Sequence, residues 1–442
     1  MDEPQIKKVH FVGIGGIGIS ALARYYLSEG WKVSGSDISA SDLTRELEAE
    51  GVLFRLGQEE RNIPPDLSLV IYSAAVPKTN PERKAAEEIN IKTLSYAQAI
   101  GELTKKYFTI AVSGSHGKST TTSLLSLILI KAGFDPTVIV GTKLREFKGK
   151  NFRKGKSQYL VLEADEWNKS FHNYHPQMIV LTNIDAEHLD TYKNYEGVVS
   201  AFEKYIKKLP KKGVLFANAK DKGMLTITEN LSASRRTKTK NSNLKVVWYN
   251  KENFEEHPLQ IPGKHNQLDA EAAWQAAKYL GVKESDADMV FSSFKGAWRR
   301  MELLKKKKAG FTFYSDYAHH PTEIKATLSA LRGAYKDKKI ICIFQPHQQD
   351  RLTRLFSDFL TAFRDADEAV IVPIYKVAGR EEKQGTDAFS LVQKIKEKQK
   401  NVFYAPTFED AVRTVRNRCP DGGVVVFMGA GNIDEMARKS LG

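Results

Sequence analysis

The chain has 442 residues, of which 41% are hydrophobic and 27% are charged, and its formal net charge is +14 at pH 7. This length and composition predict a globular protein of two or three domains and exclude a disordered chain. The longest mostly apolar run, 124–130, is too short to cross a bilayer, and the charged segment 1–8 does not have the pattern of a secretory signal. Two cysteines, Cys342 and Cys419, stand in no metal or redox spacing. We therefore expect a cytoplasmic protein that does not bind membranes.

The positive charge is spread along the chain rather than gathered in one module. Lysines are frequent at 204–222, 305–308 and 394–400, with no recognisable nucleic-acid-binding pattern around them. Such runs are typical of solvated faces, so we expect no nucleic-acid partner. A positive protein also attracts small polyanionic substrates.

The first segment alternates between strand and helix patterns, which indicates a parallel sheet covered by helices. Strands are expected at 9–12, 31–34 and 69–72, and helices at 20–29, 43–50 and 80–89. A glycine turn follows the first strand, with Asp37 at the end of the second; its glycines are Gly13, Gly15, Gly16 and Gly18. Such a turn lets the backbone approach a diphosphate, while an acid holds a ribose hydroxyl. The glycines do not distinguish a dinucleotide from a nucleotide sugar, or from a turn needed only for packing.

The second segment begins near Lys105 and contains a short phosphate-binding loop. The loop follows the apolar run 107–112, precedes a helix expected at 121–132, and consists of Gly114, Ser115, His116, Gly117, Lys118, Ser119 and Thr120. A strand that turns through glycines into a helix directs several backbone N–H groups at one anion. Lys118 adds a mobile positive charge, and the Ser119 hydroxyl is placed to bind Mg²⁺ on a nucleotide. The sequence therefore predicts binding of a nucleoside triphosphate, although only two residues separate the glycines.

Acidic groups follow the next two strands of this segment, expected at 159–162 and 178–181. Glu163, Asp165 and Glu166 follow the first, and Asp185, Glu187 and His188 follow the second. Carboxyl ends of neighbouring parallel strands meet at one edge of a sheet, where Mg²⁺ can bridge carboxylates and phosphates. A helix cap or a surface turn is the alternative role for either group.

A helix expected at 268–280 is preceded by Pro262 to Asn266, and Asn266 is expected to cap it or to bind a base.

The third segment starts near Leu303, with strands expected at 311–314, 340–344, 369–372 and 424–428 and helices at 321–331 and 352–363. Asp316, Tyr317, His319 and His320 follow its first strand, and Gln345, His347, Arg351 and Arg354 follow its second. The paired histidines lack further ligands for zinc. At the carboxyl ends of parallel strands, these groups face a ligand crevice or the surface.

Taken together, these motifs resemble the Mur ligase family of peptidoglycan synthesis along essentially the whole chain. The motifs are His10-Phe11-Val12-Gly13, the short phosphate-binding loop, Glu163-Ala164-Asp165-Glu166, Thr182-Asn183, Pro262-Gly263-Lys264-His265-Asn266, Arg299-Arg300, the run from Asp316 to Glu323, and Met428-Gly429-Ala430-Gly431. The resemblance implies an α/β protein of three domains. These are a Rossmann-like UDP-sugar domain at 1–104, a mostly parallel ATP-binding domain at 105–302, and a Rossmann-like amino-acid domain at 303–442.

The resemblance also implies roles for individual residues. The glycine turn (Gly13, Gly15, Gly16 and Gly18, with Asp37) receives the UDP pyrophosphate, and residues Gly114 to Thr120 hold ATP. Ser119, Glu163 and His188 bind Mg²⁺, and Lys118, Glu163 and His188 are catalytic. Asn266, Arg300 and Asp316 contact the nucleotide, and Tyr317, His347 and Arg351 lie near the amino acid. The implied reaction phosphorylates the lactyl carboxylate of UDP-N-acetylmuramate with ATP, and an amine, L-alanine first, displaces the phosphate. The protein is expected to be a monomer or homodimer.

Three departures from the family pattern bear on the acceptor. Trp167 and Asn168 follow Glu166 where the family has Ser-Asp, Glu187 stands for the usual Asp, and Gln348 replaces a frequent arginine after Gln-Pro-His. A ligase that adds a tripeptide to the same sugar therefore stays an alternative, as does a non-catalytic nucleotide-binding relative. A dehydrogenase that uses NAD would leave the phosphate-binding loop unexplained.

Overall fold

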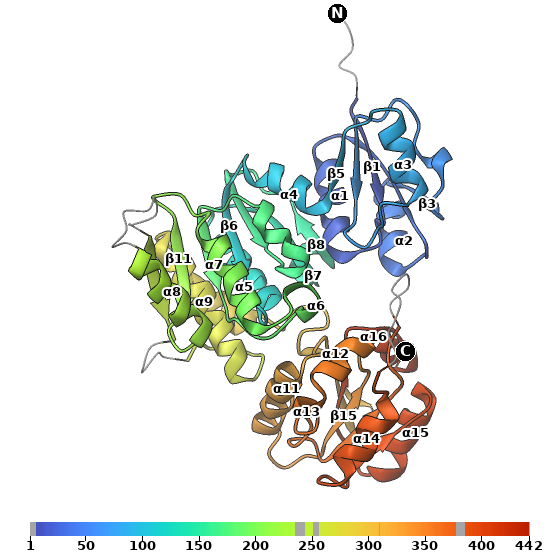
Figure 1. Ribbon diagram of the computed structural model, residues 1–442. Helices are drawn as coiled ribbons and strands as arrows, with labels where there is room; N and C mark the ends of the chain where they lie inside the picture. The colour runs from blue at the N-terminus through green and yellow to red at the C-terminus, as the bar shows by residue number, and fades with distance from the viewer. Residues whose placement is uncertain (1–5, 235–243, 251–255, 309, 377–384, 442) are drawn as a thin grey trace, which may run out of the picture. The chain divides into compact units, whose positions relative to one another are not determined.

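The structure is a computed structural model that describes residues 6–234, 244–250, 256–308, 310–376 and 385–441 (Figure 1). Its strands form three mostly parallel sheets of five, seven and six strands. Two compact units carry them: residues 1–257 with 268–291, and residues 258–267 with 292–442. The α/β class and the three sheets expected from the sequence are confirmed.

The first sheet has the strand order β3-β2-β1-β4-β5, and all its neighbours are parallel. Its strands are β1 (Lys8–Val12), β2 (Lys32–Asp37), β3 (Leu53–Leu56), β4 (Leu69–Tyr72) and β5 (Thr93–Ser95), and its helices are α1 (Ile17–Ser28), α2 (Asp42–Ala49), η1 (Glu60–Asn62), α3 (Pro81–Glu88) and α4 (Tyr96–Thr104). The order reverses at β1, because β2 lies on one side of it and β4 on the other. Ligands bind at such reversal points, and the glycine turn follows β1.

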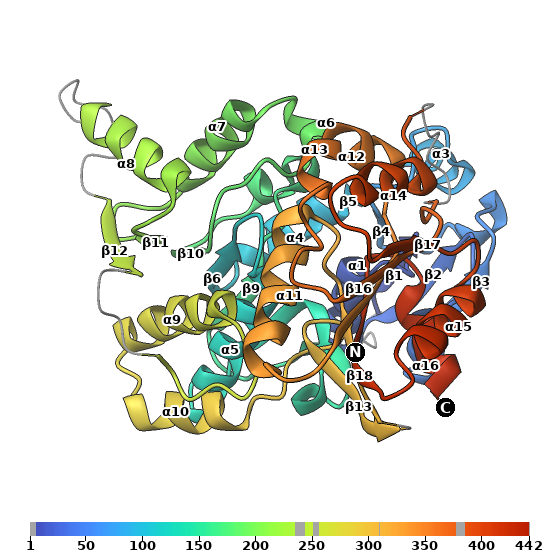
Figure 2. The ribbon, with the colours of Figure 1, turned by 90° about the horizontal axis from the view of Figure 1, so that it is seen from below.

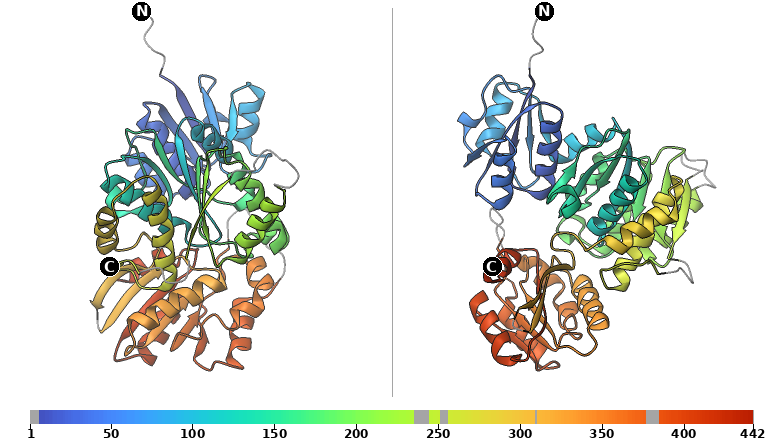
Figure 3. Two further views of the ribbon diagram at one scale, coloured as in Figure 1. Left: turned by 90° about the vertical axis from the view of Figure 1, so that its left-hand side faces the viewer. Right: turned by 180° about the vertical axis from the view of Figure 1, so that it is seen from behind.

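The central sheet has the order β12-β11-β10-β6-β9-β7-β8, with β7 and β8 antiparallel. Its strands are β6 (Phe108–Ser113), β7 (Thr137–Leu144), β8 (Lys150–Arg153), β9 (Tyr159–Glu163), β10 (Met178–Leu181), β11 (Val214–Asn218) and β12 (Lys245–Tyr249). Its helices are α5 (Lys118–Lys131), η2 (Arg145–Phe147), η3 (Trp167–Asn173), α6 (Leu189–Tyr192), α7 (Tyr195–Ile206), α8 (Lys222–Ser234), α9 (Lys264–Tyr279) and α10 (Glu284–Ser293). Figure 2 shows α7 and α8 over one face and α5 and α9 over the other, and Figure 3 shows α5 beside α9 from behind. Because β6 lies between β9 and β10, the carboxyl ends of all three meet.

The last sheet has the order β13-β14-β18-β15-β16-β17, and only β13 runs antiparallel to its neighbour. Its strands are β13 (Glu302–Lys308), β14 (Phe311–Asp316), β15 (Ile340–Phe344), β16 (Glu368–Ile371), β17 (Val402–Tyr404) and β18 (Gly423–Met428). Its helices are α11 (Pro321–Ala334), α12 (Gln349–Arg354), α13 (Phe356–Phe359), α14 (Ala388–Lys396), α15 (Phe408–Arg418) and α16 (Ile433–Leu441). One apolar core joins the sheet to α11, α13 and α14, and another joins it to α15 and α16.

The structure corrects two expectations about helices. The helix expected at 352–363 is interrupted: α12 ends at Arg354, and the short α13 begins at Phe356. Asn266 does not cap a helix, because α9 begins two residues before it, at Lys264. Among the described residues, no helix combines the length and the apolar character that crossing a membrane requires.

Candidate active site

The glycine turn between β1 and α1 is held by backbone and side-chain contacts from the end of β2. Gly13 has φ +77°, and the N–H groups of Gly13 and Ile14 donate to the Ser36 carbonyl at 2.9 and 3.0 Å. The Gly15 N–H donates to Asp37 Oδ2 at 2.8 Å, the distance at which a Cβ on Gly15 would meet the same oxygen. The predicted acid therefore lies directly on the predicted turn, at the start of α1, where the helix dipole favours an anion.

The phosphate-binding loop between β6 and α5 requires both of its glycines. Gly114 and Gly117 have φ of +134° and +81°, which other residues adopt only with strain. A Cβ on Gly114 would lie 2.0 Å from Thr182 Oγ1, and one on Gly117 would lie 2.1 Å from Asp269 Oδ1. The loop is thus packed against Thr182, which follows β10, and against Asp269 of α9.

The residues after β10 fix the two positions between these glycines. The N–H groups of Ser115 and His116 donate to the carbonyl and to Oδ1 of Asn183, at 3.0 and 2.9 Å. Asp185 donates its N–H to Ser115 Oγ at 2.8 Å, and its Oδ2 lies 2.9 Å from His116 Nε2. Asn183 and Asp185 therefore shape the loop, a role that the sequence motif alone did not reveal.

The acids after β9 lie against Lys118 and Ser119. Lys118 Nζ donates to Glu166 Oε2 at 2.9 Å and to the Gly114 carbonyl at 2.6 Å. Burial disfavours the ammonium, yet Glu166 and Asp165 outweigh it and raise the pKa of Lys118. Burial raises the pKa of Glu166 to about 7, although Lys118 lowers it. Lys118 is therefore charged at neutral pH.

The predicted metal ligands and their neighbours form two groups in this part of the chain. Ser119 Oγ donates to Glu163 Oε1 at 3.0 Å, and the other oxygen of Glu163 accepts the Gly141 N–H at 2.7 Å. His188 Nε2 lies 3.7 Å from Glu166 Oε1 and 3.9 Å from Asp165 Oδ1, and ligand atoms of these three residues lie within 4.8 Å of one another. Carboxylate and hydroxyl oxygens suit Mg²⁺. The predicted metal residues therefore fall into two groups, with Ser119 and Glu163 in one and His188 in the other.

The second unit contains the remaining predicted nucleotide residues. Asn266 Nδ2 donates to the Pro262 carbonyl at 2.6 Å. Asp316 accepts the N–H groups of Met301 and Ala318 at 2.7 and 2.8 Å, and burial raises its pKa against these donors. The Arg300 guanidinium lies 4.8 Å from the centre of the Tyr317 ring, a cation–π contact beside Asp316.

The predicted amino-acid residues form a chain of ring contacts in the same unit. The Tyr317 and His319 rings are 5.4 Å apart, and those of His319 and His347 are 6.1 Å apart. His347 stacks on Tyr375 at 5.7 Å, and Arg351 Nη1 lies 3.4 Å from His347 Nδ1. Sequence reasoning missed Tyr375, because it follows β16 without a motif around it.

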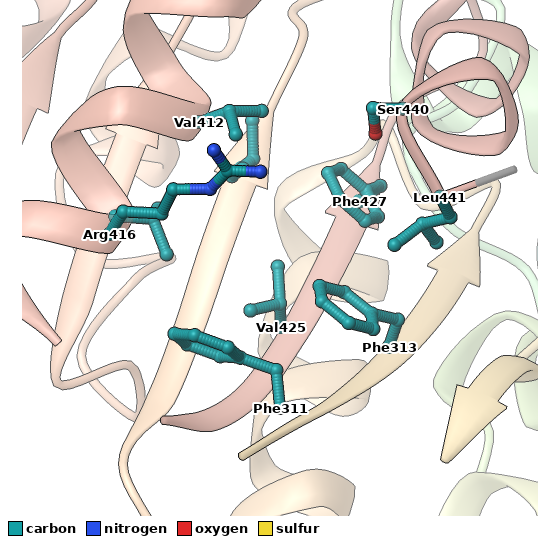
Figure 4. Close-up of a pocket in the computed structure, with 10 residues that line it drawn as sticks. Phe311, Phe313, Val412, Arg416, Val425, Phe427, Ser440 and Leu441 are labelled. Atoms are coloured by element: carbon teal, nitrogen blue, oxygen red, sulfur yellow. The ribbon is translucent and has the colours of Figure 1, made fainter. Parts of the chain in front are cut away.

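A separate hollow in this unit contains none of the predicted residues. Figure 4 shows it on the sheet face that α15 and α16 cover, with Arg416 beside the apolar side chains. Its lining residues are Phe311, Phe313, Ile343, Val412, Val415, Arg416, Val425, Phe427, Ser440 and Leu441. The hollow is lined mostly by apolar side chains, and the predicted chemistry is assigned to residues outside it.

Comparisons with known proteins decide the family. Three family models match successive parts of the chain: "Mur ligase family, catalytic domain" at residues 8–108, "Mur ligase middle domain" at 112–277 and "Mur ligase, glutamate ligase domain" at 299–431. The chain belongs to the Mur ligase family. As a member of that family it is an enzyme that forms amide bonds at the expense of ATP.

Relatives of this Mur ligase align with it along nearly its whole length. The UDP-N-acetylmuramate–L-alanine ligase of Clostridium novyi is 39% identical, over 98% of this chain and 97% of the relative, and that of Aquifex aeolicus is 38% identical, over 99% and 98%. Among solved structures, the UDP-N-acetylmuramate–alanine ligase of Thermotoga maritima has a TM-score of 0.79 at 25% identity, with 98% of each chain covered. A murein peptide ligase of Psychrobacter arcticus shares the fold, with a TM-score of 0.70, 20% identity and 98% of each chain covered.

Proposed function

We propose that this Mur ligase joins L-alanine to the lactyl carboxylate of UDP-N-acetylmuramate, with ATP converted to ADP and phosphate. The observation that carries the proposal is the near-complete alignment with UDP-N-acetylmuramate–L-alanine ligases at 38–39% identity. The first unit supports it, because it holds both the glycine turn after β1 and a loop of the phosphate-binding type with its lysine and acids. We also propose the boundaries 1–104, 105–302 and 303–442 for the three domains, and a cytoplasmic location.

The first step phosphorylates the sugar carboxylate. A lactyl oxygen attacks the γ-phosphorus, the bond from phosphorus to the β–γ bridging oxygen breaks, and ADP leaves. Lys118, charged in its acidic surroundings, offsets charge on the transferred group, and the N–H groups of the loop orient the phosphates. Ser119 and Glu163 would hold Mg²⁺, which would neutralise phosphate charge, and the group around His188 offers ligands for a second ion.

The second step forms the amide. The amine nitrogen attacks the acyl carbon, phosphate leaves with its oxygen, and the nitrogen loses a proton. The ring contacts around His347, together with Arg351, support an amino-acid site in the second unit. The carboxylate of a small amino-acid acceptor needs a positively charged partner in the site. The Arg351 guanidinium is a suitable partner, because it can donate two hydrogen bonds to one carboxylate. An acyl phosphate must be kept from water.

A panel of acceptors tests the proposal. The protein is incubated with ATP, Mg²⁺ and UDP-N-acetylmuramate, together with L-alanine, glycine, L-serine or the tripeptide, and both phosphate release and product mass are measured. We expect a product with L-alanine at the highest kcat/KM. A product only with the tripeptide would replace this function by the recycling alternative.

Loss of the loop lysine tests the phosphoryl-transfer step. Lys118→Ala removes the charge beside Glu166, and turnover should fall at least a hundredfold, a size typical of losing one preorganised electrostatic group. Lys131→Ala is the matched control, since this exposed lysine ends the same helix. A Lys118→Ala enzyme with a near-normal rate would contradict the proposed role of the loop.

A further inference from the structure

Tyr96 lies against the glycine turn of the first unit. It is the first residue of α4, and its backbone is fixed by a capping box in which Gln98 N–H donates to Ser95 Oγ at 3.2 Å and Ser95 N–H donates to Gln98 Oε1 at 2.8 Å. The phenol lies against Gly18 of the glycine turn. A Cβ added to Gly18 would meet Tyr96 Oη at 3.0 Å and Cζ at 3.2 Å.

Helix α4 also packs against η3, which follows the acids after β9: a Cβ on Gly101 of α4 would meet the Asn173 carbonyl at 2.5 Å. Burial, followed by the charges of Asp165 and Glu163, raises the pKa of Tyr96. A tyrosine hydroxyl keeps its proton at neutral pH and is available as a donor. Within the part of the chain that the structure describes, this hydroxyl makes no hydrogen bond. The residue as a whole is half-buried.

The proposed reaction requires a ligand to cross the space beside this hydroxyl. The pyrophosphate would lie on the glycine turn, and the lactyl carboxylate must reach the phosphate held by Lys118 and Ser119. The sugar half of the substrate must therefore extend toward Glu163 from the turn, where the Tyr96 phenol lies against Gly18. The group that must reach the phosphate is the lactyl carboxylate, which acts as the nucleophile. A neutral hydrogen-bond donor can orient this carboxylate without neutralising its negative charge.

We propose that Tyr96 is a substrate-positioning residue that donates a hydrogen bond to the lactyl carboxylate of the UDP-sugar. The assignment rests on the proposed function. It goes beyond the sequence motifs, because Tyr96 belongs to none of them and is brought to the site by the fold of α4 against α1.

Two nucleotide sugars that differ only in the lactyl group test the assignment. Binding of UDP-N-acetylmuramate and of UDP-N-acetylglucosamine to the full-length enzyme is measured by calorimetry without ATP, for the wild type and for Tyr96→Phe. The variant should bind the first about tenfold more weakly, as expected for a lost hydrogen bond to a charged group, and the second within twofold of the wild type. Its KM for ATP should stay unchanged. Tyr159→Phe, a second tyrosine of the same unit away from the turn, is the matched control.

The outcomes separate this assignment from the proposed function. Equal weakening for both sugars, or a lowered melting temperature with equal affinities, would show a structural role and overturn the assignment. No change for either sugar would overturn it as well. If the wild type fails to bind UDP-N-acetylmuramate, the proposed function itself falls and the assignment falls with it. Only a loss selective for the lactyl sugar, at an unchanged melting temperature, supports it.

Discussion

Replacing Arg24 should loosen the attachment of the glycine turn to the central sheet. Arg24 lies on α1, the helix that the turn starts, and is 3% exposed. Its Nε donates to Glu50 at 3.0 Å, its Nη2 lies 3.3 Å from Glu46, and its Nη1 donates to Asn151 Oδ1 of β8 at 2.5 Å. One guanidinium thus joins two helices of the first sheet to a strand of the second.

The size of the effect follows from what Arg24→Met leaves behind. Removing one partner of a buried ion pair costs about 3–5 kcal/mol. Here Glu50 keeps Lys150 at 3.3 Å and Glu46 keeps Lys143 at 2.5 Å, while their side chains are 19% and 38% exposed. Solvent and these lysines reduce the cost, so we expect a loss of about 2–3 kcal/mol in the free energy of unfolding. The KM for UDP-N-acetylmuramate should also rise, since the glycine turn would be less well held.

Urea unfolding measures this loss, with the midpoint shift converted through a common m-value. Arg45→Met is the matched control, because Arg45 pairs with Asp42 on the surface, where the side chains are 64% and 73% exposed. Its cost should stay below about 0.5 kcal/mol. Equal costs for the two variants, or a loss below about 1 kcal/mol for Arg24→Met, would refute the reasoning.

Three further predictions concern separate features. Gly117→Ala adds a methyl group 2.1 Å from Asp269 Oδ1 at φ +81°, so ATP affinity should fall at least tenfold in a binding titration, and wild-type affinity would contradict the packing of the loop. His10 and Ser36 lie 3.4 and 2.5 Å from the Glu82 carboxylate, and Glu82→Leu removes this partner from both. The substitution should lower the free energy of unfolding by about 2–3 kcal/mol in urea, and Glu82→Gln should lower it less. A larger loss for Glu82→Gln than for Glu82→Leu would contradict the role of these hydrogen bonds. Burial lowers the pKa of His265 from 6.5 to about 4, so the neutral ring stabilises the fold above pH 6.5 and this contribution is lost as the pH falls toward 4. The free energy of unfolding should fall by about 3 kcal/mol over this pH range, and the fall should be much smaller in His265→Gln. Parallel stability profiles of the two proteins would contradict the prediction.

Local patterns predicted the parts of the site that lie on one continuous stretch of chain. The glycine turn with Asp37 and the loop with Lys118 each join a strand to a helix, and backbone chemistry sets such units within a few residues. Glu163 was predictable because parallel strands bring their carboxyl ends to one edge. Its metal-binding role, like the other predicted roles, stays a prediction.

The residues that sequence reasoning missed reach the site through tertiary packing. Tyr96 meets Gly18 from the start of α4, Asp269 meets Gly117 from α9, and Tyr375 meets His347 from the end of β16. No local spacing encodes such pairs. Sequence reasoning also missed the short edge strands β3 and β5 and the antiparallel β7–β8 hairpin. Pairing with a neighbouring strand defines these elements, rather than a periodic pattern in their own sequence.

Helix ends were misjudged where loop geometry decides them. Gly263, at φ +113°, turns the chain so that α9 begins immediately after it, and this places Asn266 inside the first turn rather than at the cap. The helix is interrupted after Arg354, between two helix-forming stretches, where the sequence contains no glycine or proline that would predict a break.

The most direct test of the account is phosphate release with UDP-N-acetylmuramate, ATP, Mg²⁺ and L-alanine, with the product identified by mass. The account predicts release that depends on both the sugar and L-alanine, with one alanyl residue added per phosphate, and its loss in Lys118→Ala. Phosphate release that is independent of the sugar, or a sugar that gains no alanine while ATP is bound, would contradict it.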